Sequence, residues 1–195
     1  MNEDLTPATE PTFYFIGMTT AKSSIMKVFP AWAEYLELRA VIRGVDCRWH
    51  DDPERYRGVV RLIRDDPLSL GALVTTHKID LLSAARDLFD GLGEHARLLG
   101  EVSSISKHGG ELWGHAKDPV TSGLAMEAFL PADHWRDSGA DLCLLGAGGS
   151  SLALTTYCME RLPQGNRPAR IVVTNRSEPR LNSMREVHEI GRAHV

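Results

Sequence analysis

A glycine-rich turn constrains the fold of this chain more than any other feature. It lies within residues 141–151, DLCLLGAGGSS, between an apolar run and a run with helical spacing of apolar residues. Gly146, Gly148 and Ser151 fill the three small-residue positions of the pattern G-x-G-x-x-G/A. Gly149 adds a further position without a side chain. These elements predict the start of a Rossmann-type domain, in which a dinucleotide pyrophosphate binds at the helix N-terminus. A tight strand-to-helix turn without a ligand is the alternative.

The next predicted strand indicates which dinucleotide is bound. It spans residues 170–175, RIVVTN, and Arg176 follows at its end. An NAD site usually has an acidic residue here for the ribose 2′-hydroxyl, whereas an arginine can pair with the 2′-phosphate of NADP. The sequence therefore favours NADP, and a solvated loop arginine is the alternative for Arg176. The predicted cofactor-binding residues are Gly146, Ala147, Gly148, Gly149, Ser150, Asn175 and Arg176.

Upstream of this turn, predicted strands and helices alternate with short connections. Apolar runs predict strands at residues 13–17, 40–50 and 70–76, and each is followed by a segment with helical periodicity. Residues 102–116 predict a hairpin, because His108-Gly109-Gly110 separates two alternating runs. The pattern predicts an α/β protein, with an N-terminal α/β substrate domain followed by a partial Rossmann NADP-binding domain.

The predicted boundaries follow polar and turn-rich segments. We expect a disordered lead at residues 1–11, a substrate-binding catalytic domain at 12–130, a linker at 131–139 and the partial Rossmann domain at 140–188.

The end of the chain predicts a truncated protein. A dinucleotide-binding domain needs more than one βαβ unit, and this chain ends soon after its second predicted Rossmann strand. Residues 189–195, EIGRAHV, are the peptide expected from in-frame translation of a common sequencing adapter, so we expect a non-native tail. A natural helix end is the alternative. An isolated fragment of this kind is expected to be inactive.

Composition and charge exclude several classes of protein. The chain has 195 residues, 43% hydrophobic and 25% charged, which is typical of a soluble globular protein. Its net charge of -4 and scattered arginines provide no basic field for nucleic acid. The three cysteines form no C-x-x-C pair, and there is no signal peptide or apolar segment of membrane-spanning length. We therefore expect a cytoplasmic monomer or homodimer that binds a small-molecule substrate, without a metal or membrane contact.

Four motifs occur in a fixed order along the chain. They are LVTTHK at residues 73–78, GHAKD at 114–118, and GAGGSS at 146–151 followed by TNRS at 174–177. Their order and spacing resemble those of the shikimate dehydrogenase family, NADP-dependent oxidoreductases of aromatic amino-acid biosynthesis. The family patterns are V-T-x-P-H-K, G-x-N-T-D, G-A-G-G and N-R-T, and the resemblance spans roughly residues 13–188.

The resemblance implies that Lys78 is catalytic and that Asp118 is its partner. The implied reaction is the NADPH-dependent, reversible reduction of 3-dehydroshikimate, or a related cyclic keto-acid, to the alcohol. A lysine in a cleft can exchange a proton with the substrate oxygen while hydride is transferred. From the residues alone, Lys78 could be a surface lysine at a helix start, where the helix dipole disfavours it. Asp118 could be an ordinary turn aspartate before Pro119.

Several positions depart from the family pattern. The proline before His-Lys is Thr76 here, and the asparagine of G-A-V-N-T is Ser103. The family binds the substrate carboxylate through H-S-x-S-P, where this chain has AKSSI at residues 21–25. Ser24 matches the second serine and Lys22 stands at the first. We expect Ser24, Lys22 and Ser103 to bind substrate.

These departures leave other functions open. A paralogue acting on another hydroxy- or keto-acid is one. A non-catalytic dinucleotide-binding regulator is another. A different two-domain oxidoreductase, such as a methylenetetrahydrofolate dehydrogenase, is the third.

Overall fold

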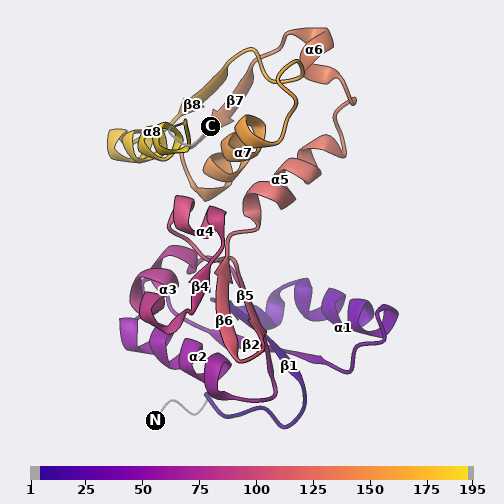
Figure 1. Ribbon diagram of the computed structural model, residues 1–195, viewed down its shortest axis with the longest axis vertical. Coiled ribbons are helices and arrows are strands. Elements are labelled where there is room, and N and C mark those ends of the chain that lie inside the picture. The colour runs from indigo at the N-terminus through magenta and orange to yellow at the C-terminus, as the bar shows by residue number, and fades with distance from the viewer. Residues whose placement is uncertain (1–4, 193–195) are drawn as a thin grey trace. The chain divides into compact units, whose positions relative to one another are not determined.

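The computed structural model describes residues 5–192, with side chains described up to residue 189 (Figure 1). The chain divides into two compact units, Met1–Ala116 and Lys117–Val195. Within the described residues, no helix is both long enough and apolar enough to cross a membrane.

A six-stranded mixed sheet forms the centre of the first unit, with strand order β2-β1-β3-β5-β6-β4. In chain order the strands are β1 (Thr12–Gly17), β2 (Val41–Asp46), β3 (Ser69–Val74), β4 (Gly91–Leu92), β5 (Ser104–His108) and β6 (Glu111–His115). Strand β1 pairs in parallel with β2 and β3, whereas β5 runs antiparallel to both β3 and β6. The connections between the parallel strands contain helices, as parallel pairing requires. The predicted α/β class and the hairpin are therefore confirmed.

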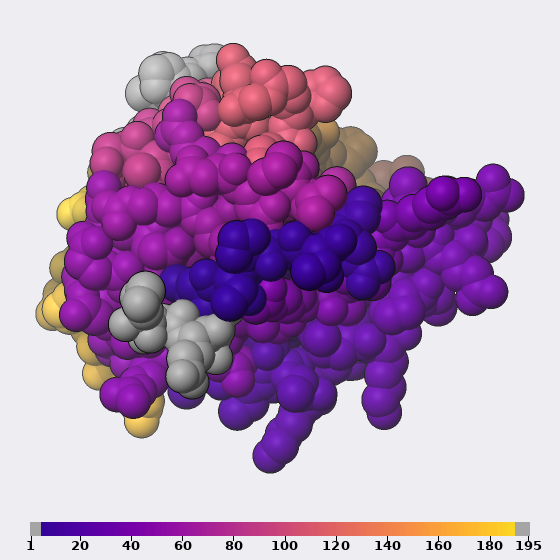
Figure 2. Space-filling view, turned by 90° about the horizontal axis from the view of Figure 1, so that it is seen from below, coloured from indigo at the N-terminus to yellow at the C-terminus, as the bar shows by residue number. Residues whose placement is uncertain are grey.

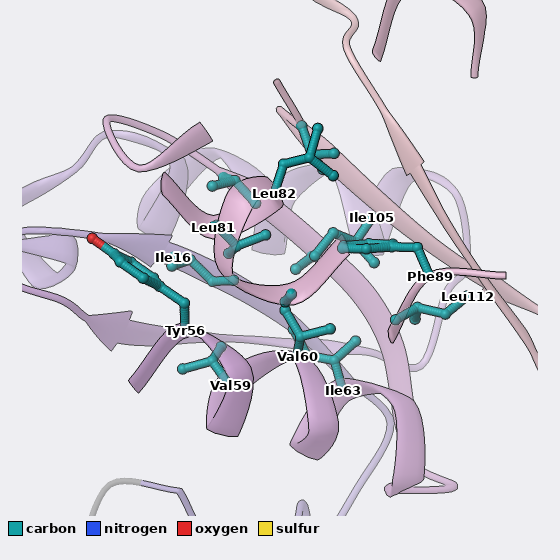
Figure 3. Packing of buried hydrophobic residues seen from close by; sticks show 14 of the residues in the cluster. Ile16, Tyr56, Val59, Val60, Ile63, Leu81, Leu82, Phe89, Ile105 and Leu112 are labelled. Atoms are coloured by element: carbon teal, nitrogen blue, oxygen red, sulfur yellow. The ribbon is translucent and has the colours of Figure 1, made fainter. Parts of the chain in front are cut away.

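The helices of this unit lie on both faces of the sheet. They are α1 (Ile25–Tyr35), α2 (Pro53–Asp65), α3 (Lys78–Ala85) and α4 (Glu94–Leu99), with short 3-10 turns η1 (Thr20–Lys22) and η2 (Arg86–Leu88). Helices α2 and α3 pack together on one face, and α1 lies on the other (Figure 1). The core between α2, α3 and the sheet includes Val59, Val60, Ile63, Leu81 and Ile105, all at most 1% exposed (Figure 3). Burying each such side chain contributes roughly 1.5–3 kcal/mol.

The apolar side chains that recur at helical spacing along and just after α1 are largely exposed. Trp32, Tyr35 and Leu36 are 57%, 87% and 58% exposed. The contact with the sheet comes from the first half of the helix, where Phe29 stacks on Phe13 of β1 with ring centroids 5.3 Å apart. Figure 2 shows the α1 region projecting at the right of the view. Periodicity therefore predicted the helix correctly, but its apolar face is not the buried face of the described structure.

The predicted disordered lead is wrong for residues 5–11, which are held against the first unit. The N–H of Ala8 donates a hydrogen bond to Asp66 Oδ2 at 2.6 Å, and Leu5 packs against the core. A buried carboxylate after α2 thus provides an acceptor that no local pattern in the lead reveals. Residues 1–4 of the predicted lead lie outside the described residues.

Asp66→Asn is expected to destabilise the first unit. The Asp66 carboxylate is 6% exposed and accepts hydrogen bonds from the N–H groups of Ala8 and Leu68 and from the Tyr14 hydroxyl, at 2.6, 2.9 and 3.4 Å. Burial acts to raise the pKa of this carboxyl, but the hydrogen bonds hold it below its usual value. We expect the substitution to lower the free energy of unfolding at pH 7 by about 1–2 kcal/mol.

The same variant predicts a change in acid stability. Because the folded pKa of Asp66 is depressed, its contribution is present above the unfolded pKa of about 4 and is lost as the pH falls through the folded pKa. Chemical denaturation at pH 7 and near pH 3 should therefore show a smaller acid loss for Asp66→Asn than for wild type. The exposed neighbour Asp65, changed to Asn, is the matched control. An unchanged acid loss in Asp66→Asn would contradict the assignment.

The second unit contains one βαβ arrangement with additional helices. Its elements are α5 (Asp118–Glu127), α6 (His134–Ser138), β7 (Leu142–Leu145), α7 (Gly149–Glu160), β8 (Ile171–Thr174) and α8 (Glu178–Arg192). Strands β7 and β8 pair in parallel, with Leu142 opposite Ile171, and α7 connects them. The core of this unit is formed by Met126, Trp135, Tyr157, Cys158 and Leu162.

The division between the units differs from the predicted linker at residues 131–139. It falls between Ala116 and Lys117, because α5 packs on α7 and so belongs to the second unit. The packing is close enough that a Cβ on Gly123 would lie 2.1 Å from Cγ of Tyr157. Much of the predicted linker is helical, since it contains α6.

Strand β7 is apolar but only partly buried, and part of the predicted tail is helical. The apolar run that forms β7 is only partly buried, because Leu145 is 88% exposed and Cys143 is also exposed. One face of the two-stranded sheet packs on the core through Leu142 and Ile171, and the alternate side chains point away from it. The predicted tail at residues 189–195 begins inside α8, and residues 193–195 lie outside the described part.

Candidate functional site

The glycine turn joins the end of β7 to the start of α7. Gly146 has φ of +121°, a value that glycine adopts without the steric penalty of a side chain, and its N–H donates to Thr174 O at 2.8 Å. Gly148, the N-cap of α7, has an extended backbone with φ of −85° and ψ of −176°. A Cβ added at Gly148 would meet no atom within 4 Å. The backbone therefore requires glycine at position 146, whereas neither backbone nor packing requires it at 148.

The N-terminus of α7 is suited to an anion. It has no acidic residue in its first turn and no side-chain capping hydrogen bond. The first N–H groups of an α-helix lack intrahelical partners and form the positive end of its dipole. Gly149, Ser150 and Ser151 occupy this first turn, beside the open space at Gly148. These residues fit the pyrophosphate of a dinucleotide, which would approach the backbone where a side chain is missing.

Asn175 ties the loop after β8 to the glycine turn. Its Oδ1 accepts a hydrogen bond from the Ala147 N–H at 3.4 Å, and its Nδ2 donates to the backbone O and Oγ of Ser177 at 3.0 and 3.1 Å. Asn175 therefore organises the loop in which Arg176 follows. The side chain of Arg176 is exposed at the carboxyl end of β8.

In the first unit, Lys78 is the first residue of α3 and follows β3 through a short turn. Its carbonyl oxygen accepts a hydrogen bond from the Val102 N–H at 3.1 Å, and the Ser103 carbonyl accepts one from Val74 N–H at 2.9 Å. The loop before β5 therefore lies beside the start of α3. The structure brings the predicted residues Lys78 and Ser103 to one edge of the sheet, at the carboxyl end of β3.

The other predicted substrate-binding residues belong to the same edge. Lys22 ends η1 and Ser24 is the N-cap of α1, and both are exposed in the connection that follows β1. Strands β1 and β3 are parallel neighbours, and Thr75 N–H donates to Ile16 O at 3.0 Å where they end. Ligands of open α/β sheets bind outside the carboxyl ends of the strands.

Two of the predicted site residues have unexpected positions. Ser103 is buried, and Asp118 belongs to a different unit from Lys78. Ser103 is only 3% exposed, and its hydroxyl donates a hydrogen bond to His115 O at 3.5 Å. Asp118 begins α5 and belongs to the second unit, whereas Lys78 belongs to the first. The predicted catalytic pair thus comes from two units.

A buried contact behind Lys78 was missed by the sequence reasoning. His77 Nδ1 lies 3.1 Å from the hydroxyl of Tyr56 on α2, and both residues are 1% exposed. Burial raises the pKa of the Tyr56 hydroxyl, although a hydrogen bond from the Asp51 N–H opposes the shift. His77 Nε2 has no hydrogen-bond partner among the described residues. Tyr56 lies at helical spacing with the buried residues Val59, Val60 and Ile63 of α2, and nothing in that spacing indicates a histidine partner from another element.

A cavity of about 740 Å³ also lies within the first unit, beyond the ends of β1 and β2. Its lining includes Met18, Asp46, Cys47, Trp49 and Arg55. Asp46 accepts hydrogen bonds from the N–H and hydroxyl of Thr20 at 2.8 and 2.7 Å, so this carboxylate holds the loop after β1. Among the described residues, no cluster of His, Cys, Asp and Glu could hold a metal ion.

No protein-family model matches the chain. Several solved structures match its fold. One is shikimate 5-dehydrogenase from Listeria monocytogenes in complex with shikimate and NAD, at 20% identity and a TM-score of 0.71. Shikimate 5-dehydrogenase from Thermus thermophilus, in complex with NADP(H) and shikimate, matches at 21% identity and 0.65. The 5-ketofructose reductase of Gluconobacter matches at 19% identity and 0.66.

These matches extend over both units. They cover 97%, 91% and 92% of this chain, respectively. The chain spans 60% of the Listeria and Thermus proteins and 58% of the Gluconobacter protein. Over the part of these proteins that it spans, the chain has the fold of the shikimate dehydrogenases.

Proposed function

We propose that the protein is an NADPH-dependent carbonyl reductase of the shikimate dehydrogenase type. Its substrate is 3-dehydroshikimate or a related cyclic keto-acid, which it reduces reversibly to the alcohol. The observation that carries the proposal is the open space beside Gly148, at an α7 N-terminus with no side-chain cap. The shared fold and the position of Lys78 at a strand end support it.

The cofactor is held by the glycine turn and by the loop after β8. The first-turn N–H groups of α7, including those of Gly149 and Ser150, bind the pyrophosphate. Arg176 pairs with the 2′-phosphate, and Asn175 keeps the arginine loop joined to Ala147 of the glycine turn. When bound, NADPH supplies the hydride that reduces the carbonyl carbon.

Lys78 and Asp118 handle the proton and the neighbouring hydroxyl. In the reducing direction the Lys78 ammonium donates its proton to the carbonyl oxygen, and in the oxidising direction the amine accepts the proton from the alcohol. Asp118 accepts a hydrogen bond from the adjacent substrate hydroxyl and so orients the reacting carbon. These two assignments rest on the motif resemblance.

Lys22 and Ser24 bind the substrate carboxylate, and Ser103 lines the same edge. Lys22 acts as a point charge where the family pattern has a hydroxyl, which attracts the anion but fixes its orientation less well. A keto-compound other than 3-dehydroshikimate is the second candidate substrate. The match to a 5-ketofructose reductase favours this candidate, because that protein has the same fold and is named for a different substrate.

The proposal is tested with the protein expressed from its complete reading frame. NADPH oxidation is followed with 3-dehydroshikimate, 3-dehydroquinate, 5-ketofructose and a panel of keto-acids. Turnover with 3-dehydroshikimate or another cyclic keto-acid supports the proposal. Turnover only with 5-ketofructose supports the second candidate. NADPH binding without turnover of any substrate would instead indicate a dinucleotide-binding regulator.

Arg176→Ala is expected to weaken NADPH binding about 10-fold while leaving NADH binding unchanged, because the guanidinium contacts only the 2′-phosphate. The two dissociation constants are measured by cofactor fluorescence. Arg180→Ala, at an exposed position on α8, is the control. Equal weakening of both cofactors by Arg176→Ala would show that this arginine does not read the phosphate.

A further inference from the structure

The turn between β3 and Lys78 has a strained backbone. Thr76 has φ of +64°, in the left-handed region. A β-branched residue is a genuine outlier there, because its side chain crowds the backbone. The family pattern resembled by LVTTHK has proline at this position, and a proline φ is fixed near −65°. A proline at position 76 could not adopt the φ that Thr76 has in this turn.

The residues around Thr76 are held on both sides. The His77 N–H donates to Thr75 O at 2.6 Å, and Leu81 N–H donates to His77 O at 2.8 Å. The imidazole is anchored from α2, where the Tyr56 hydroxyl lies 3.1 Å from His77 Nδ1 and also accepts from Asp51 N–H at 3.2 Å. Figure 3 shows this hydroxyl at the margin of the aliphatic cluster, pointing away from it. The ring of Tyr56 is fixed by the core, and its hydroxyl lies within reach of His77 Nδ1 and also of Arg48 O, at 3.4 Å.

We propose that the Thr75–His77 turn is a positioning device for Lys78, in which the buried Tyr56–His77 contact holds Thr76 in its left-handed conformation. Strained backbone persists only where its surroundings over-determine it, and such strain gathers at functional sites. Here the surroundings are the Tyr56–His77 contact and the first turn of α3. The proposal rests on the proposed function, because it assigns the strain to the placement of the proposed catalytic lysine.

Thr76→Gly separates placement from folding. Glycine occupies the left-handed region without crowding, so the variant should fold with an equal or slightly higher melting temperature. Glycine also reaches many other conformations, so the start of α3 should no longer be fixed. We expect turnover to fall about 10- to 100-fold with KM changed much less, as for a small misplacement of a reacting group. Tyr56→Phe removes the anchoring hydroxyl and should reduce turnover in the same way.

Glu37→Gly is the matched control. Glu37 also has a left-handed backbone, with φ of 55°, just after α1 and far along the chain from Lys78. The control relieves the same kind of strain at a position that does not lead into α3. Its turnover and KM should equal those of the wild type.

A second readout does not depend on activity. An amine-reactive acylating reagent is applied at fixed pH, and mass spectrometry compares the labelling rate of Lys78 with that of the exposed Lys27 on α1. We expect the ratio to change at least threefold in Thr76→Gly and Tyr56→Phe, and to stay at the wild-type value in Glu37→Gly.

The outcomes distinguish failure of the positioning device from failure of the proposed function. Altered Lys78 labelling in a protein that turns over no substrate would support the positioning device and reject the proposed function. Wild-type labelling in both Thr76→Gly and Tyr56→Phe would overturn the positioning device, whether or not turnover falls. Wild-type turnover in both variants, with Lys78→Met inactive, would also overturn it and leave the proposed function standing.

Discussion

Lys78→Met is expected to lower turnover about 10³-fold, the range that positioned acid–base groups contribute, while NADPH still binds. Methionine keeps an unbranched stem of similar length and removes only the charge and the exchangeable proton. Lys78 is the first residue of α3, where the helix dipole disfavours a positive charge. Turnover and the unfolding midpoint are therefore measured together, so that an effect on the chemistry is separated from an effect on folding.

The measurement compares single-turnover NADPH oxidation, NADPH affinity and the unfolding midpoint in one preparation. Lys27→Met, at an exposed position on α1, removes the same charge away from the strand ends and should behave as wild type. Near-normal turnover in Lys78→Met would remove this residue from the chemistry. A fall in turnover that merely tracks a fall in stability would do the same.

Local patterns in the sequence predicted most elements of this fold. Strands β1, β2 and β3 and the β5–β6 hairpin follow from short apolar or alternating runs ended by turn residues. Helix α2 begins where sequence rules place it, with Pro53 in its first turn and the Asp52 side chain accepting from Glu54 N–H at 2.9 Å. These features are encoded within a few residues of where they occur.

The errors arose where contacts between distant segments decide the structure. The unit boundary moved because α5 packs on α7 through Gly123, which appears in the sequence only as one glycine inside a helix. The lead residues are held by Asp66, which is 58 positions from Ala8. The apolar residues of α1 form a regular stripe, yet periodicity does not state what, if anything, covers it.

The candidate site was also predicted only in part, where local patterns determine it. The motif order led to Lys78 and Ser103, and the structure places both at the carboxyl end of β3. It also shows Ser103 to be buried, which no spacing rule indicates. The left-handed Thr76 and the Tyr56–His77 contact could not be predicted, because a backbone angle in a turn is set by the tertiary contacts that hold it.

Gly148→Asp is expected to weaken NADPH binding at least 100-fold, equivalent to about 2.7 kcal/mol, without destabilising the protein. Gly148 already has an extended N-cap backbone, and a Cβ there would meet no atom within 4 Å. Aspartate is among the best N-cap residues and its charge complements the helix dipole, so α7 itself should become slightly more stable. The same carboxylate would occupy the N–H groups of the first turn and repel a pyrophosphate. Stability and cofactor affinity should therefore change in opposite directions.

Gly165→Asp is the matched control, because Gly165 follows α7 and a Cβ there also meets no atom within 4 Å. It adds the same charge to the same unit away from the helix N-terminus, so NADPH affinity should stay within about twofold of wild type. Fluorescence titration gives the affinities and thermal unfolding gives the stabilities. Wild-type NADPH affinity in Gly148→Asp would mean that the turn is a structural connection between strand and helix. Loss of affinity together with increased stability is a result that a purely structural turn cannot produce, because a better cap would then have no ligand to displace.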